Sequence, residues 1–119
     1  MRHFLAAAVF LTSCTSAPAQ NPETVIVGFG ANTCANIVKN YREGPKAMGI
    51  LIISYAQGFW SGQNSVLMQA GAPVLKNLAG DGETHVKALM ADCADRPSDH
   101  FGLVIRDYFF KLPKASMPK

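Results

Sequence analysis

The chain has 119 residues and carries 11 Lys and Arg against 8 Asp and Glu, which gives a formal net charge of +3. These charges are scattered, with no basic run and no basic patch interleaved with aromatics, so the sequence does not predict a nucleic-acid-binding surface. The longest uninterrupted apolar stretch after the N-terminus, residues 47–53, is far below the roughly 20 residues of a membrane-spanning helix. The length allows one small domain, which buries only part of its chain's surface.

Residues 1–19 are predicted to be a secretory signal peptide. An apolar run from Phe4 to Leu11 follows a positive N-terminus, and Ala17-Pro18-Ala19 provides the small residues of a cleavage site. Overlapping it, Leu11-Thr12-Ser13-Cys14 is similar to the lipobox of bacterial lipoproteins, whose cysteine is lipidated and becomes the mature N-terminus. We therefore expect a periplasmic or secreted protein, and a lipid anchor at Cys14 is the alternative to cleavage after Ala19.

Residues 20–32 are expected to form an extended N-terminal arm, because the run from Thr24 to Phe29 is rich in β-branched residues. Gly28 and Gly30 resemble part of a dinucleotide-binding loop. However, Thr33 takes the place of the third glycine and no βαβ unit follows. A turn into the next helix explains the glycines better, and we expect no cofactor.

Two cysteines, Cys34 and Cys93, remain in the mature domain. In an oxidising compartment an even pair of cysteines in a small domain is most simply a disulfide. The bond would close a long loop, and the chain-entropy model gives such a bond about 4 kcal/mol. This is comparable to much of the net stability of a small domain.

The apolar periodicity of residues 33–113 predicts an all-α domain, a small bundle of about four helices linked by one disulfide. The first helix is expected to run from a cap at Asn32 or Thr33 to about Tyr41. The central helix is apolar around most of its circumference and begins at Pro45, where a missing N–H costs nothing. We expect it to end at Gly62.

Two further helices are expected in the second half of the chain. The third runs from a cap within residues 81–84 to about Ala94, and the fourth from Ser98 to shortly before Pro113. Residues 65–82, with three glycines and one proline, are expected to form a long connection with an adaptable surface. Residues 114–119 are left as a C-terminal tail.

We expect neither a metal site nor an enzyme. His85 and His100 with the two cysteines do not have the spacing of known zinc sites, and a disulfide would use both sulfurs. It would also leave no thiolate to act as a nucleophile. No pair of carboxylates is embedded in apolar sequence in a way that would shift a pKa.

The second half of the central helix is the candidate partner-binding surface. Gly49 and Gly58 each cost a helix interior about 1 kcal/mol relative to alanine, so a contact should offset them. One explanation is a close helix crossing at Gly49 and Ala56. The other is a surface on which large aromatics hold a protein partner. The candidate residues for that surface are Tyr55, Gln57, Phe59, Trp60 and Asn64.

Three short motifs resemble the HdeA/HdeB-type small periplasmic helical proteins of proteobacteria. They are Thr33-Cys34 at the start of a helix, Tyr55-x-x-Gly58-x-x-x-Gly62-x-Asn64, and Cys93-x-x-x-Pro97 before the last helix. The resemblance covers most of the mature chain, from about Thr33 to Leu112, although the connection at 65–82 has no counterpart. It implies an all-α domain with one disulfide, here between Cys34 and Cys93.

The resemblance also implies a function. The best-known members are acid-stress chaperones that form homodimers near neutral pH, loosen at low pH and hold unfolding periplasmic proteins as clients. This sequence has the charge for such a response. Protonating its acids and histidines would raise the side-chain charge of the mature chain from about +2 to about +12, and the repulsion could open an apolar interface.

A second resemblance implies another kind of partner. The Tyr-x-x-Gly helix and the Cys-x-x-x-Pro pattern are also similar to the Rap-type immunity proteins of type VI secretion, which bind and block a cell-wall hydrolase. The expected partner is then one specific effector protein instead of many unfolded clients.

Overall fold

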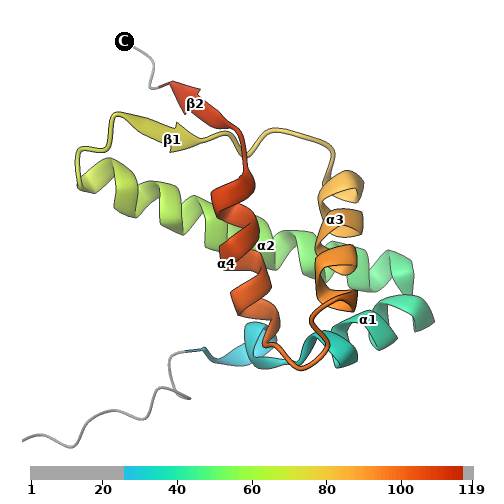
Figure 1. The fold of residues 1–119 in the computed structure, drawn as a ribbon. Helices are drawn as coiled ribbons and strands as arrows, with labels where there is room; N and C mark the ends of the chain where they lie inside the picture. The colour runs from blue at the N-terminus through green and yellow to red at the C-terminus, as the bar shows by residue number, and fades with distance from the viewer. Residues whose placement is uncertain (1–25, 117–119) are drawn as a thin grey trace, which may run out of the picture.

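The computed structural model describes residues 26–116, which form four α-helices, one 3₁₀ turn and a two-stranded antiparallel sheet (Figure 1). The expected all-α class is confirmed. In chain order the elements are η2 (Gly28–Ala31), α1 (Cys34–Glu43), α2 (Pro45–Gln69), β1 (Val74–Lys76), α3 (Gly82–Ala94), α4 (Phe101–Lys111) and β2 (Lys114–Ser116). The predicted signal peptide, Cys14 and the first part of the N-terminal arm lie outside the described residues.

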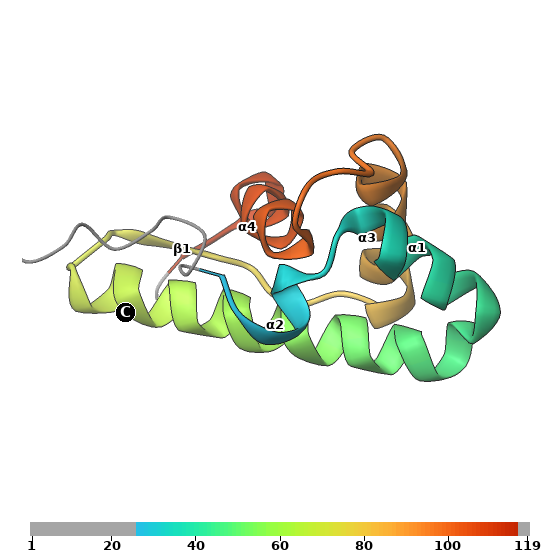
Figure 2. The same cartoon turned by 90° about the horizontal axis from the view of Figure 1, so that it is seen from below.

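The long helix α2 lies along one side of the domain, and the other three helices and the sheet lie on the other side (Figure 2). α1, α3 and α4 all pack against it, and β1 follows its C-terminal half. Its fully buried residues are four apart, the spacing of one helix face. They are Ile52, Ala56 and Trp60.

The apolar faces expected for the shorter helices form the core. Buried side chains lie at Cys34 and Ile37 of α1. Leu112, directly after α4, and the following residues of α3 and α4 surround the same interior: Val86, Leu89, Met90, Cys93, Phe101, Val104, Ile105 and Phe109. Most of this set follows from helical periodicity.

Side-chain caps begin α1 and α3 where the sequence predicts them. The Thr33 hydroxyl accepts a hydrogen bond from the Asn36 backbone N–H at 3.4 Å, and an Asp81 carboxylate oxygen accepts one from the Thr84 N–H at 2.9 Å. The Thr84 backbone bond is also the main reason why the pKa of Asp81 lies below its ordinary value. Each cap satisfies an N–H that has no partner inside the helix.

The predicted end of α2 at Gly62 is wrong, because the helix continues to Gln69. The glycine that stops the helix is Gly71, two residues after Gln69. Its φ of 71° is the left-handed conformation that glycine adopts without strain. The Gly71 N–H donates to the Met68 carbonyl and the Ala72 N–H to the Leu67 carbonyl. These are the two bonds of a Schellman motif, which satisfies the last carbonyls of a helix.

The long connection is accordingly shorter than predicted. Residues 65–69 belong to α2, and residues 74–76 form β1, which pairs with β2 in the register Leu75 to Ala115. Part of the expected C-terminal tail is thus a strand.

At the N-terminal end of the described chain, Gly28–Ala31 of the expected extended arm forms a 3₁₀ turn, so the arm is not extended throughout its described part.

The predicted start of α4 at Ser98 is also wrong, since the first helical residue is Phe101. The loop before it binds the start of α1 instead. The Pro97 and Asp99 carbonyls accept hydrogen bonds from the Ala35 and Cys34 N–H groups at 3.0 and 2.8 Å. Residues 97–99 therefore satisfy the unpaired N–H groups of another helix instead of beginning their own.

The expected disulfide is confirmed. Cys34 of α1 and Cys93 of α3 are bonded across a sequence separation of 59 residues, and both side chains are fully buried. The bond links the first helix to the third and closes most of the described chain into a loop. Closing a long loop removes much conformational freedom from the unfolded chain.

Replacing both cysteines by Ser should lower the free energy of unfolding by about 4 kcal/mol, because the unfolded chain gains the entropy of an open loop. Chemical denaturation at neutral pH measures this change. As a control, alkylation of the native, unreduced protein should label neither Cys34 nor Cys93. Labelling of either thiol would contradict the bond.

Candidate functional site

The five candidate partner-binding residues do not lie on one surface. Tyr55 and Phe59 are half-buried on the side of α2 that faces α4, whereas Gln57 is exposed and two residues from Tyr55, so it points to a different side of the helix. Trp60 and Asn64 have structural contacts of their own. Only Tyr55 and Phe59 are brought together with other side chains around a cavity.

Trp60 is a core residue, which contradicts its assignment to a partner-binding surface. Its side chain is 0% exposed, and its indole N–H donates to the Ile105 carbonyl at 3.1 Å. Its ring stacks on Tyr108 at a centroid distance of 5.5 Å and meets the His85 ring edge-on at 5.4 Å. Trp60 continues the buried line of α2 at the point where α4 crosses, so it joins α2 to α3 and α4.

Asn64 holds β1 against α2. Its side-chain amide donates to the Lys76 carbonyl at 2.8 Å and its side-chain oxygen accepts from the Lys76 N–H at 2.9 Å. The Lys76 ammonium then donates to the carbonyls of Phe110 and Leu112 at the end of α4. These bonds occupy both ends of the Asn64 amide, so its role in the described structure is to position the sheet.

The strongest candidate site is an apolar groove between α2 and α4, here called the α2/α4 groove. It encloses about 330 Å³. Its walls come from α2, from α4 and from the segment before η2, and are formed by Tyr55, Phe59, Gly102, Leu103, Arg106, Ile26 and Val27. Val27 is 73% exposed at its edge. An apolar cavity with one polar group at the rim is the usual form of a binding site.

Close packing of η2 builds one end of the groove. The Phe29 ring lies 5.5 Å from the Tyr55 ring and 5.7 Å from the Phe101 ring, measured between centroids. Gly102 has no side chain where η2 approaches α4, and a Cβ there would stand 3.1 Å from an Ile26 methyl carbon. The small residue therefore lets the N-terminal segment lie directly against α4.

The groove residues outside α2 were missed by the sequence analysis. Leu103 carries the clearest signal, because it is an apolar residue outside the buried stripe of α4, which contains Phe101, Val104 and Ile105. Such a residue on an amphipathic helix indicates a second apolar surface. Ile26 and Val27 reach the groove through tertiary folding, which no local pattern predicts.

Ion pairs fix the charged rim of the groove. Arg106 donates two hydrogen bonds to one carboxylate oxygen of Asp107, at 2.9 and 2.7 Å, and Arg96 donates to the other at 2.9 Å. The bond from Arg106, followed by that from Arg96, holds the pKa of Asp107 below its ordinary value of 3.8, although burial opposes them. The Arg96 bond ties the loop after α3 to α4.

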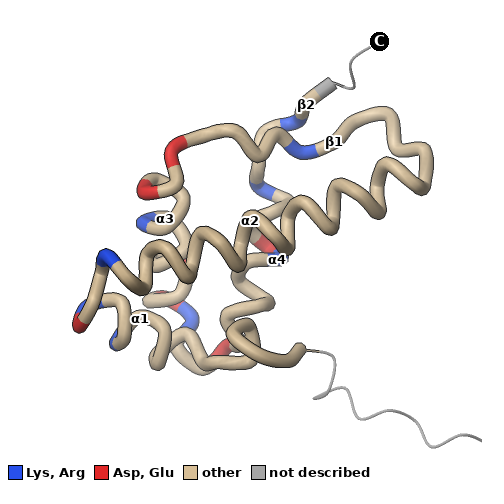
Figure 3. Tube along the Cα trace, turned by 180° about the vertical axis from the view of Figure 1, so that it is seen from behind, with Lys and Arg blue, Asp and Glu red and all other residues tan. Residues whose placement is uncertain are grey.

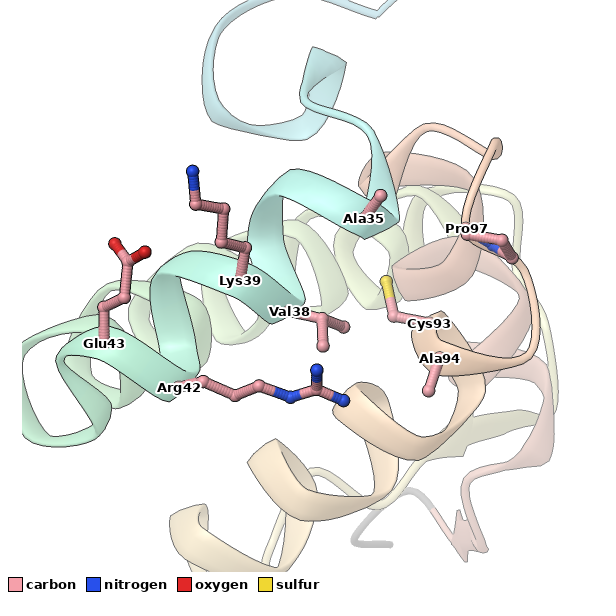
Figure 4. A pocket seen from close by; sticks show the side chains of 8 residues that line it. All are labelled: Ala35, Val38, Lys39, Arg42, Glu43, Cys93, Ala94 and Pro97. Carbon is pink, nitrogen blue, oxygen red and sulfur yellow. The ribbon is translucent and has the colours of Figure 1, made fainter.

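A second cavity of about 410 Å³ lies beside the disulfide, between α1 and α3. Figure 4 shows Arg42 reaching from α1 toward α3, while Lys39 and Glu43 point away from the other side chains. Its inner wall is formed by Val38, Ala94 and Cys93, whose sulfur is already oxidised in the disulfide. This cavity offers no nucleophile and no enclosed polar group.

A third cavity, of about 440 Å³, lies where α1, α2 and α3 meet. Tyr41, Ile50 and Ile53 line it together with the charged residues Lys46, Asp81 and Glu83, which are exposed. Because these charges are in solvent, the cavity lacks the apolar character of the α2/α4 groove.

The two histidines considered as metal ligands lie in unrelated places. His85 is buried beside Trp60, with Nδ1 3.1 Å from the Tyr108 hydroxyl, and burial raises the pKa of Tyr108. His100 Nδ1 donates to the Ala31 carbonyl at 2.8 Å. Within residues 26–116, no group of three or more His, Cys, Asp or Glu side chains is arranged to hold a metal ion.

Comparison with protein-family models, with curated proteins and with solved structures found no match to this chain. The HdeA/HdeB-type and Rap-type resemblances therefore stay predictions. In the part of the chain that the structure describes, no helix is both long enough and apolar enough to cross a membrane.

Replacing Trp60 by Ala should lower the free energy of unfolding by about 3–5 kcal/mol, because a large buried side chain is lost. Trp60→Phe keeps an aromatic ring in the core but loses the hydrogen bond to Ile105, and this variant should retain more of the stability than Trp60→Ala. Phe110→Ala, at an exposed aromatic, is the control and should change stability by less than about 0.5 kcal/mol. Denaturation followed by circular dichroism measures all three, and a Trp60→Ala variant as stable as the native protein would contradict the buried assignment.

Asp107→Asn should lower the free energy of unfolding at neutral pH by about 1 kcal/mol, since its ion pairs are only partly shielded from solvent. The pKa of Asp107 is lowered in the folded state, so its stabilisation is complete above the ordinary value of 3.8 and is lost as the pH falls below it. The variant and the native protein should therefore converge in stability as the pH falls below 3.8. Asp95→Asn is the control, because Asp95 has no ion pair among the described residues.

Proposed function

We propose that this is a non-enzymatic, exported, HdeA-like protein that binds unfolding proteins under acid stress, with the α2/α4 groove as its binding site. The observation that carries the proposal is the groove itself. It is apolar, it is open at Val27, and it contains two of the aromatic residues that the sequence singled out, Tyr55 and Phe59. Apolar side chains of an unfolding client are the ligands that such a surface favours.

Acid provides the trigger in this proposal. The ion pairs of Asp107 stabilise the domain only while its carboxylate is charged, and the pair with Arg96 joins α4 to the loop after α3. Their loss at low pH coincides with the rise of side-chain charge toward about +12 in the mature chain. Both effects loosen α4, which forms one wall of the groove.

The disulfide supports an oxidising location such as the periplasm, where such bonds persist. It would also limit how far acid loosens the domain, since α1 and α3 stay covalently linked at any pH. The proposal includes the homodimer that the HdeA-type resemblance implies near neutral pH.

One observation favours the Rap-type alternative. The groove is a single cavity of about 330 Å³ with one charged residue at its rim, Arg106, which an ion pair with Asp107 holds in place. This volume lies at the small end of the range for ligand sites and suits a few side chains of one partner better than many different clients. An effector that places an apolar side chain in the groove and an acidic group near Arg106 would match it.

Client binding is tested by light scattering from a protein that aggregates at about pH 2.5, below the ordinary carboxyl pKa values. The native protein should suppress aggregation. Val27→Asp should weaken this at least about tenfold, because a polar group at the edge of the groove opposes apolar contact. Val74→Asp, at an exposed apolar residue of β1 away from the groove, is the matched control and should act like the native protein.

Absence of any suppression by the native protein would contradict the chaperone proposal. The immunity alternative would then be tested with a cell-wall hydrolase encoded beside the gene. The native protein should inhibit that enzyme and Val27→Asp should not, and a failure to inhibit would exclude this alternative.

A further inference from the structure

The side of α2 that faces away from the domain is not covered by any other described element (Figures 2 and 3). It presents large apolar side chains to solvent near both ends of the helix, with Leu51 toward the start and Met68 toward the end. Ile50, which also lines the third cavity, lies at the border of this side. We call this surface the outer face of α2. Its exposed residues, which recur at helical spacing, are Ala47, Ile50, Leu51, Ser54, Gly58, Ser61, Gly62, Ser65, Met68 and Gln69.

The outer face carries no charge. Lys46, at its beginning, is the one charged residue of α2, and the next in the chain is Lys76 (Figure 3). The surfaces of the other helices, by contrast, carry ion pairs such as Lys87–Glu83 and Lys111–Asp92. A long exposed helix side that is apolar at both ends and lacks charges has the composition of a contact surface.

Nothing in the described chain uses the glycine in the middle of this face. A Cβ at Gly58 would meet no atom within 4 Å, so the close helix crossing considered from the sequence does not explain it. The same is true of Gly49, whose added Cβ would make only an ordinary contact of 3.8 Å with Tyr41. At Gly58 a partner's backbone could approach closely.

Charge and symmetry identify the partner. When two copies meet by a twofold axis, the same face of each copy contacts the other, so a face with charges of one sign would meet like charges. The outer face avoids this. In an antiparallel arrangement Lys46 of one copy also lies near the C-terminal end of the other copy's α2, where the helix dipole is negative. A parallel arrangement would place the two Lys46 side chains together.

The antiparallel arrangement also matches side chains in size. With the axis midway between Gly58 and Ser61, Gly58 faces Ser61 of the other copy and Leu51 faces Met68, by the rise of 1.5 Å per residue. Small residues thus meet at the centre, where the helices are closest. The large apolar residues meet on either side of it.

We propose that a second copy of this chain covers the outer face of α2, by antiparallel packing of the two α2 helices. This inference rests on the homodimer of the proposed function and locates its interface, but it does not depend on the α2/α4 groove. The 25 residues of α2 span about 37 Å, and a strip of that length offers roughly 400 Å² per copy. A standard interface has about 800 Å² per copy, so the dimer is weak and depends on concentration.

Analytical ultracentrifugation of the mature protein at neutral pH, from about 1 µM to 1 mM, tests the inference. The native protein should show a monomer–dimer equilibrium in this range. Leu51→Glu should raise the dissociation constant at least about tenfold, because it places an unpaired charge against the apolar side chains of the other copy. Leu51 is 53% exposed, so the variant should keep its fold, which circular dichroism checks.

Val66→Glu is the matched control. Val66 is 60% exposed on the same helix but points away from the outer face, so this variant should dimerise like the native protein. A native protein that stays monomeric throughout, a Leu51→Glu variant that still dimerises, or an equal loss in both variants would each overturn the proposal. Light scattering by the groove variants reports on client binding separately. The proposed dimer can therefore fail while the proposed client binding holds, and the reverse is also possible.

Discussion

The fold depends on one contact, the packing of Trp60 at the crossing of α2 and α4. Its indole N–H binds the Ile105 carbonyl in the middle of α4, and its ring lies against Tyr108 and against His85 of α3. Three helices therefore meet at a single side chain. This contact fixes where α4 crosses α2, and the α2/α4 groove lies on one side of that crossing.

Around this crossing, α2 has three faces with different contacts. The line of Ile52, Ala56 and Trp60 belongs to the core, Tyr55 and Phe59 face the groove, and no element within residues 26–116 covers the side opposite the core. This division explains why the helix is apolar around most of its circumference although only one face is buried. In the sequence these faces merge into one apolar pattern, because a helix that contacts neighbours on several sides loses its polar strip.

The sequence predicted those features of the fold that depend on residues close together in the chain. The caps at Thr33 and Asp81 follow from side chains that bind nearby N–H groups, and both cysteines lie on apolar helix faces of the kind that helical periodicity indicates. Gly62 and Gly71 look alike in the sequence. Only Gly71 ends α2, because two backbone bonds that form there require its positive φ. The strands, the Asn64 bonds and the groove residues Ile26 and Val27 depend on partners far away in the chain, so the sequence pattern did not reveal them.

The backbone bonds around the start of α1 have a consequence for the chemistry of the disulfide. The Cys34 and Ala35 N–H groups bind the loop after α3, and the Phe101 N–H binds the Asn32 carbonyl, so this junction is held without the sulfurs. If the bond were reduced in the folded domain, the two thiols would remain neighbours at a high effective concentration. An oxidant would then need only to take up two electrons, because the fold already holds the two thiols beside each other.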